Sequence, residues 1–107
     1  MPSLPQRRTQ VFVRDNYTCR YCGLEMKDLY FSWLERKIKR RQAKITVDHV
    51  IPLSIFHKLG LKGIISPWNV NNLKTACDDC NLKRANNVKD EEIAEVFTLV
   101  KNQRLFT

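Results

Sequence analysis

Apolar side chains recur at helical spacing in two long segments of the chain. Residues 28–42 place an apolar stripe on one side and basic residues on the other. The stripe consists of Tyr30, Trp33, Leu34 and Ile38. Residues 90–101 carry acidic side chains in their first turn, with Asp90 as the expected N-cap, and an apolar face. That face consists of Ile93, Val96, Phe97 and Val100. Both segments are predicted as helices, and the second as scaffold.

Two segments between these helices have the character of β-strands. Residues 45–51 read ITVDHVI, a run rich in β-branched residues that Pro52 ends, and residues 72–77 read NLKTAC. Residues 78–87 are predicted as a helix, and residues 6–14 as a short helix near the start. The order of these elements predicts an α+β fold in a single domain of 107 residues.

A long connection, residues 53–71, separates the two predicted strands. It contains Gly60, Gly63 and Pro67, and its pattern favours only a short helix around residues 54–59. A connection of this length with little regular structure is more typical of a functional loop than of filler.

The charge of the chain favours a polyanionic partner. The formal net charge is +8 and the pI is near 9.6, so nucleic acid is the first candidate. No run approaches the roughly 20 apolar residues of a membrane span, and no signal peptide pattern opens the chain. We therefore expect a soluble cytoplasmic protein without a membrane partner. A basic run is predicted to contact DNA phosphates, with a solvated helix face as the alternative. The run consists of Arg36, Lys37, Lys39, Arg40, Arg41 and Lys44.

Four cysteines occur in two identical spacings. Cys19 and Cys22 lie in an N-terminal knuckle, residues 17–23, and Cys77 and Cys80 form the second pair. Two such turns can place four thiolates tetrahedrally around one Zn²⁺ at about 2.3 Å, whereas disulfides are unstable in a reducing cytosol. The alternative is two buried or redox-active pairs. Because sulfur would fill all four positions, the expected zinc is structural and has no open position for hydrolysis.

Four motifs follow one another in a specific order: a Cys-x-x-Cys pair, VDHVIPLS, NLKTAC and DDCNLKRAN. This order and spacing resembles the HNH endonuclease family and its ββα-metal fold, here with flanking helices. The resemblance covers residues 7–93, is strongest over 45–86, and implies a core motif at residues 45–88. The chain departs from the family where SIFHKLGLKGIISPW replaces a compact Gly-Gly segment and where Arg84 stands in place of a common Lys. The segment that carries the basic run is also longer than usual.

The resemblance assigns its three motif positions to His49, Asn72 and Asn81, a His-Asn-Asn variant. Alternation along the strand sends Asp48 and His49 to opposite faces, so they would do different jobs at one site. His49, as a neutral imidazole with an ordinary pKa of about 6.5, would take a proton from the attacking water. Asp48 and Asn81 would hold one catalytic Mg²⁺ or Mn²⁺ through their oxygens. Asn72 would hold the loop that fixes the strand of His49.

The implied function is a divalent-metal-dependent DNA endonuclease whose product carries a 5′ phosphate and a 3′ hydroxyl. Lys83 and Arg84 are predicted to contact phosphates, and one site in a monomer or weak dimer favours nicking of one strand of duplex DNA. The alternatives are a non-catalytic zinc-ribbon module that binds nucleic acid and a structured-RNA nuclease. Each site residue also has an ordinary interpretation: His49 as a satisfied core histidine, Asp48 as the ion-pair partner of an arginine, and Asn81 as a helix-start residue.

Overall fold

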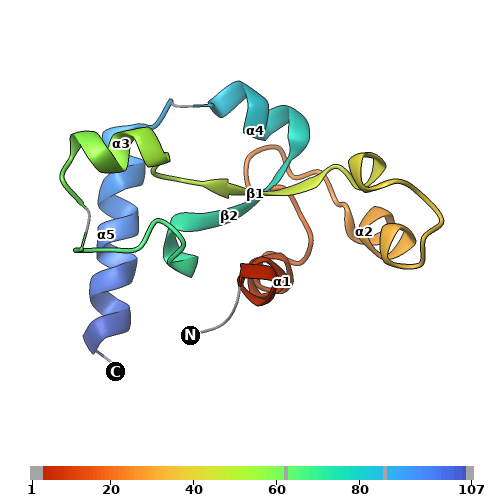
Figure 1. Ribbon diagram of the computed structural model, residues 1–107, viewed down its shortest axis with the longest axis horizontal. Coiled ribbons are helices and arrows are strands. Elements are labelled where there is room, and N and C mark those ends of the chain that lie inside the picture. Colours follow the sequence, from red (N-terminus) through yellow and green to blue (C-terminus); the bar gives the residue numbers. More distant parts are fainter. Residues whose placement is uncertain (1–3, 62, 86, 106–107) are drawn as a thin grey trace.

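The computed structural model describes residues 4–61, 63–85 and 87–105. Within these ranges the chain forms an α+β domain with five α-helices, two short 3-10 helices (η) and one two-stranded antiparallel sheet (Figure 1). In chain order the elements are α1 (Leu4–Arg14), α2 (Lys27–Leu34), η1 (Arg40–Ala43), β1 (Ile45–His49), α3 (Leu53–Lys58), η2 (Val70–Asn72), β2 (Leu73–Cys77), α4 (Asp78–Arg84) and α5 (Asp90–Leu105).

The hairpin of β1 and β2 is the centre of the domain. The strands pair from Ile45 opposite Cys77 to His49 opposite Leu73. Helix α1 lies on one side of the hairpin and α4 on the other, while α3 and α5 pack at the end where β1 finishes (Figure 1). Because side chains alternate along a strand, successive residues of β1 face α4 and α1 in turn.

Two apolar clusters hold the domain together. The first packs the cysteine knuckle and α2 against the start of the hairpin, and the second packs α3, the loop after it and α5 against the chain that follows β1. The buried members of the first are Phe12, Cys19, Met26, Tyr30, Ala43, Ile45, Ala76 and Cys77. Those of the second are Val50, Ile51, Phe56, Leu61, Ile65, Val96 and Val100.

A buried carboxylate connects α1, the knuckle and β2. The side chain of Asp15 is fully buried and accepts from Arg14 Nε at 2.8 Å, from Arg20 Nη1 at 2.7 Å and from the backbone N–H of Thr75 at 2.9 Å. Although burial alone would raise it, the pKa of Asp15 falls to about 2 because these donors favour the charged form. The knuckle adds a backbone bond from Arg20 N to Thr75 O at 2.9 Å, which docks it on the outer edge of β2.

The helix predicted over residues 28–42 is interrupted. Helix α2 ends at Leu34, Arg36 takes a φ of 61°, and only the 3-10 helix η1 follows, before Lys44 with the same φ. Left-handed backbone angles are incompatible with a continuing α-helix. The interruption folds the chain back so that the guanidinium of Arg40 stacks on Trp33, 4.9 Å from the ring centroid. The basic run is therefore carried by a loop and a tight turn.

Other element ends differ from the sequence prediction by a few residues. Strand β1 stops at His49, and α4 stops at Arg84, after which Ala85 has a φ of 41°. Helix α5 begins with Asp90 inside its first turn, and the Glu92 side chain accepts from the N–H of Lys89 at 3.1 Å, so Asp90 is not the cap. No helix in the described part of the chain is long and apolar enough to cross a bilayer.

Candidate functional site

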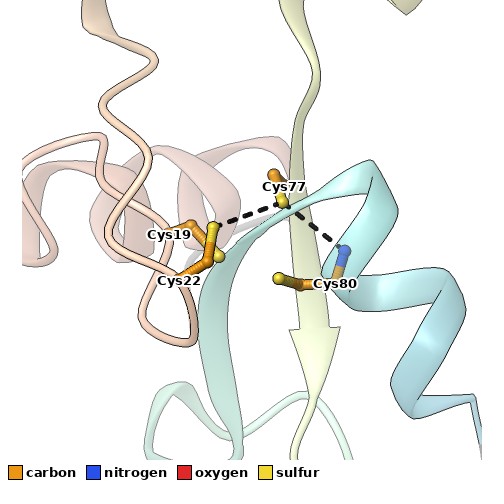
Figure 2. A group of neighbouring side chains, drawn as sticks. All are labelled: Cys19, Cys22, Cys77 and Cys80. Atoms are coloured by element: carbon orange, nitrogen blue, oxygen red, sulfur yellow. Dashed lines mark hydrogen bonds between the residues drawn. The ribbon is translucent and has the colours of Figure 1, made fainter.

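The four cysteine sulfurs converge at one point beside the hairpin. Cys19 and Cys22 come from the knuckle after α1, Cys77 ends β2, and Cys80 lies in the first turn of α4 (Figure 2). All four Sγ atoms lie within 4.8 Å of one another, and Cys22 Sγ is 3.8 Å from Cys77 Sγ. A tetrahedron with metal–sulfur bonds of about 2.3 Å has edges of about 3.8 Å. The cluster therefore has the composition and size of a four-cysteine zinc site.

The backbone of the knuckle favours the thiolate form of Cys19. Gly23 has a φ of 81°, which lets the chain turn and its N–H bond Cys19 O at 2.9 Å. Although burial opposes it, backbone N–H groups lower the pKa of the Cys19 thiol to about 6. Burial raises the pKa of Cys77, and contact with the Cys77 sulfur raises that of Cys80 to about 12. Zinc binding by this cluster would therefore release protons.

Asp48 is buried on the α4 side of β1, and its carboxylate is held at one oxygen. The hydroxyl of Tyr21 and the Nε of Arg84, the latter at 3.0 Å, both donate to Asp48 Oδ2. The side chain of Arg84 is 17% exposed and also pairs with Glu92 at 2.8 Å, which connects α4 to α5. Asp48 Oδ1 has no hydrogen-bond partner among the described residues. The sequence-based alternative of an Asp48–arginine ion pair is therefore present in the structure.

Tyr21 acts as a donor because it stays protonated. Burial raises the pKa of its hydroxyl, and the adjacent Asp48 carboxylate raises it further. Tyr21 lies between Cys19 and Cys22, so the same knuckle that supplies two cysteines also orients the Asp48 carboxylate.

Asn81 presents its amide oxygen on the same side of β1. Its Nδ2 donates to Thr46 Oγ1 at 3.0 Å, and Thr46 Oγ1 donates to Ala76 O at 2.8 Å. Since a hydroxyl has one proton, Thr46 must accept from the Asn81 N–H, which leaves the Asn81 oxygen available. A cavity of about 340 Å³ borders Thr46 and Asn81.

His49 lies on the opposite side of β1. Its ring meets Trp68 edge to face, with the centroids 4.4 Å apart and an interplanar angle of 80°. Its Nε2 is buried and has no partner among the described residues, a situation that commonly costs about 1–3 kcal/mol. Burial lowers the pKa of His49 and Arg8 lowers it further, against an opposite effect of Asp48. The imidazole is therefore neutral at neutral pH.

Asn72 holds the chain that leaves β1. The residue is fully buried. Its Oδ1 accepts from Ile51 N at 2.8 Å, and its Nδ2 donates to Ile51 O at 3.3 Å and to Pro67 O at 3.0 Å. Its backbone O accepts from Val50 N at 2.8 Å. Asn72 thus joins the turn after His49 to the end of the long loop.

The predicted phosphate-binding residues lie in the segment after α2 and on α4. All six residues of the basic run are exposed on the loop and turn after α2, and Lys83 is exposed on α4. The exposed members of the run other than Arg40 are Arg36, Lys37, Lys39, Arg41 and Lys44. Arg40 is exposed too, but its Nη2 donates to Ile45 O at 2.7 Å. Arg84 differs because it is largely buried and paired with Asp48 and Glu92.

Sequence reasoning missed three residues that shape this region: Asp15, Tyr21 and Trp68. The adjacent Arg14 and Asp15 just before the knuckle were a detectable signal for Asp15, since neighbouring opposite charges suit an ion pair. Tyr21 and Trp68 had no such signal, because only the fold brings them to Asp48 and His49.

The described residues thus support an α+β domain with a four-cysteine cluster suited to zinc. Within the described ranges, no other group of three or more His, Cys, Asp or Glu side chains is close enough to share an ion. No protein-family model, no curated protein sequence and no solved structure matches the chain at a significant level.

Proposed function

We propose that this protein is a divalent-cation-dependent DNA endonuclease with a ββα-metal (HNH) site and a structural zinc. The observation that carries the proposal is the arrangement around β1. A buried imidazole nitrogen without a partner lies on one side, and two available oxygens lie on the other.

The order of the elements supports the likeness to the HNH family. His49 ends β1, Asn72 comes just before β2, and Asn81 lies on the helix that follows β2. The four cysteines fasten this strand–strand–helix unit from the side. The motif positions implied by the sequence resemblance therefore follow the order of a ββα unit, with Asn72 in η2 directly before β2, which supports the proposal.

The donor set on the α4 side of β1 suits a hard cation. Asp48 Oδ1 and the Asn81 amide oxygen are the ligand types that Mg²⁺ and Mn²⁺ prefer, and one or two protein ligands are enough for ions that keep several waters. Tyr21, Arg84 and Thr46 occupy the other atoms of these two side chains, so they orient the free oxygens. When bound, the cation would neutralise phosphate charge and stabilise the departing oxygen.

His49 would accept a proton from the attacking water. The neutral ring required for that step is favoured by its burial. The water oxygen bonds to phosphorus as the bond to the 3′ oxygen breaks, and that oxygen takes a proton from solvent. Asn72 keeps the His49 end of β1 fixed through its bonds to Ile51 and Pro67. The products are a 5′ phosphate and a 3′ hydroxyl.

Supercoiled plasmid tests this function directly. Zinc-loaded protein with Mg²⁺ or Mn²⁺ should convert it to relaxed circles, because one site addresses one strand. His49→Ala should lower the rate by about 10²–10⁴-fold, whereas His57→Ala, which alters the other histidine of the chain on the exposed face of α3, should not. Absence of relaxed circles with the wild type, or equal rates for wild type and His49→Ala, would overturn the proposal. Cleavage of structured RNA in place of DNA would redirect it to an RNA nuclease.

One observation favours a second candidate, a non-catalytic zinc module that binds nucleic acid. The Asp48 carboxylate is already ion-paired with Arg84 and receives the Tyr21 hydroxyl, as in a structural network. In that case the protein would bind DNA without cleaving it in any divalent cation.

A further inference from the structure

A cavity of about 210 Å³ lies beside β1 and is bordered by α1, η1 and the long loop. Arg8 and Phe12 of α1, Arg40 of η1, Thr46 and Val47 of β1, and Trp68 of the long loop line it. Trp68 also contacts the His49 ring, so the Trp68 side chain connects the cavity to His49. None of the catalytic or zinc-binding residues proposed above lines this cavity.

The lining has the chemistry of a phosphate site. Two arginines from different elements line it, and its described lining residues include no carboxylate. Phe12, Val47 and Trp68 supply apolar walls that would contact a sugar beside the phosphate. Guanidinium groups bind phosphate oxygens through charge-assisted, paired hydrogen bonds.

Arg40 is oriented before any ligand binds. Its Nη2 donates to Ile45 O at 2.7 Å, and the ring of Trp33 supports its guanidinium at 4.9 Å. A guanidinium fixed in this way loses less rotational freedom on binding than a free surface side chain. Among the six residues of the basic run, Arg40 alone lines the cavity.

We propose that this cavity binds one backbone phosphate and its sugar from the DNA strand, with Arg8 and Arg40 holding the same phosphate. The cavity would set the register of the strand that passes His49. The proposal deepens the proposed function and rests on it for the choice of DNA, but phosphate binding itself does not depend on catalysis.

Double-mutant coupling tests whether the two arginines share a phosphate. The affinity of a fluorescein-labelled 20-base-pair DNA duplex is measured by anisotropy at several NaCl concentrations, without added divalent cation. Arg8→Gln and Arg40→Gln should each weaken binding by about 5–10-fold. The affinity of the double variant should fall by less than the product of the two single-variant fold-losses. The slope of log affinity against log NaCl concentration should decrease in magnitude by about one for the double variant.

Arg41→Gln supplies the matched control. Arg41 is an exposed arginine of the same 3-10 helix that does not line the cavity, so its effect should multiply with that of Arg8→Gln. Because Arg40 also bonds Ile45 O, Arg40→Lys is measured as well. It keeps the charge but not the paired donors, and should weaken binding less than Arg40→Gln. Thermal melts and zinc content identify any variant that fails to fold.

Each outcome decides something. If Arg8 and Arg40 combine multiplicatively, as the control pair does, or if neither alters binding, the shared phosphate site is wrong. Coupling with an RNA duplex but not with DNA would overturn the choice of DNA. Coupling with DNA in a protein that does not nick would keep the phosphate site and reject the nuclease. If the protein nicks DNA and needs His49 to do so, but Arg8 and Arg40 show no coupling in DNA binding, the nuclease is kept and the phosphate site is rejected.

Discussion

At the residue scale, the site depends on hydrogen bonds that use one atom of a side chain and leave another available. Asp48 is held at Oδ2, and Asn81 is held at Nδ2. The sequence could indicate that these residues matter, because their spacing resembles a known motif. It could not indicate Tyr21 or Thr46, because a tyrosine between two cysteines and a threonine in a strand have many ordinary explanations.

Removing the Tyr21 hydroxyl tests the orientation of Asp48. In Tyr21→Phe the carboxylate loses one of its two donors at Oδ2, and the affinity for Mn²⁺ should fall by about tenfold. Free Mn²⁺ is measured by electron paramagnetic resonance, with zinc content as the check on the knuckle. Tyr17→Phe is the matched control, since Tyr17 packs in the aromatic cluster around Tyr30. Equal Mn²⁺ affinities in the wild type and Tyr21→Phe would contradict this role.

For the proposed nuclease, the burial of His49 predicts how cleavage would depend on pH. A general base works only when neutral, and burial lowers the pKa of His49 from the ordinary 6.5. The nicking rate at fixed Mn²⁺ should therefore stay level as the pH falls from 8 to 6.5, and decline only below that value. A rate profile with its acid midpoint above pH 6.5 would show that the group responsible is not a buried histidine of this kind.

At the element scale, the sequence predicted the hairpin, α1, α4 and α5 well, because their patterns are local. It failed at residues 28–42, where the helical spacing of apolar residues continues beyond Leu34 but the α-helix ends there. The positive φ of Arg36 and the stacking of Arg40 on Trp33 are tertiary effects that outweigh helix propensity. The cavity beside β1 could not be predicted either, since it needs Arg8 and Arg40 from distant elements.

Asp15 is expected to stabilise the junction of α1, the knuckle and β2. Asp15→Asn removes two ion pairs at a buried position and should lower the free energy of unfolding by about 2–4 kcal/mol. Asp28→Asn, at an exposed acid in the first turn of α2, is the control and should have a small effect. Urea denaturation at pH 7 measures both.

The same carboxylate has a defined pH signature. Its pKa is lowered from 3.8 to about 2 in the folded protein, so its contribution is complete above pH 3.8 and is lost as the pH falls toward 2. The stability difference between the wild type and Asp15→Asn should therefore shrink over this window. A difference that stays constant down to pH 2.5 would contradict the assigned ion pairs.

At the scale of the whole molecule, the cysteine cluster brings together two segments that are far apart in the sequence, at the Ile45–Cys77 end of the hairpin. A zinc ion bound there would connect the knuckle after α1 to the junction of β2 and α4, across a long intervening segment (Figures 1 and 2). Cysteine spacing predicted this cluster directly, because two Cys-x-x-Cys turns match one tetrahedral ion. The sequence could not predict that the knuckle also places the Tyr21 hydroxyl against the Asp48 carboxylate.

Removal of zinc should unfold the domain. Zinc binding to cysteines supplies folding free energy, and here it would connect two segments that are far apart in the sequence. A chelator under reducing conditions should abolish the cooperative thermal transition seen by circular dichroism, and added Zn²⁺ should restore it. Cys22→Ser should bind zinc more weakly and melt at a lower temperature. A zinc-free protein with an unchanged melting curve would show that the cluster is not a structural metal site.

We propose that β1 and α4 hold a hard cation opposite His49, and a crystal soaked in Mn²⁺ would show whether they do. Anomalous scattering should reveal Mn²⁺ against Asp48 Oδ1 and the Asn81 amide oxygen, separate from zinc at the four cysteines. Zinc at the cysteines with no Mn²⁺ beside Asp48 and Asn81 would contradict the claim.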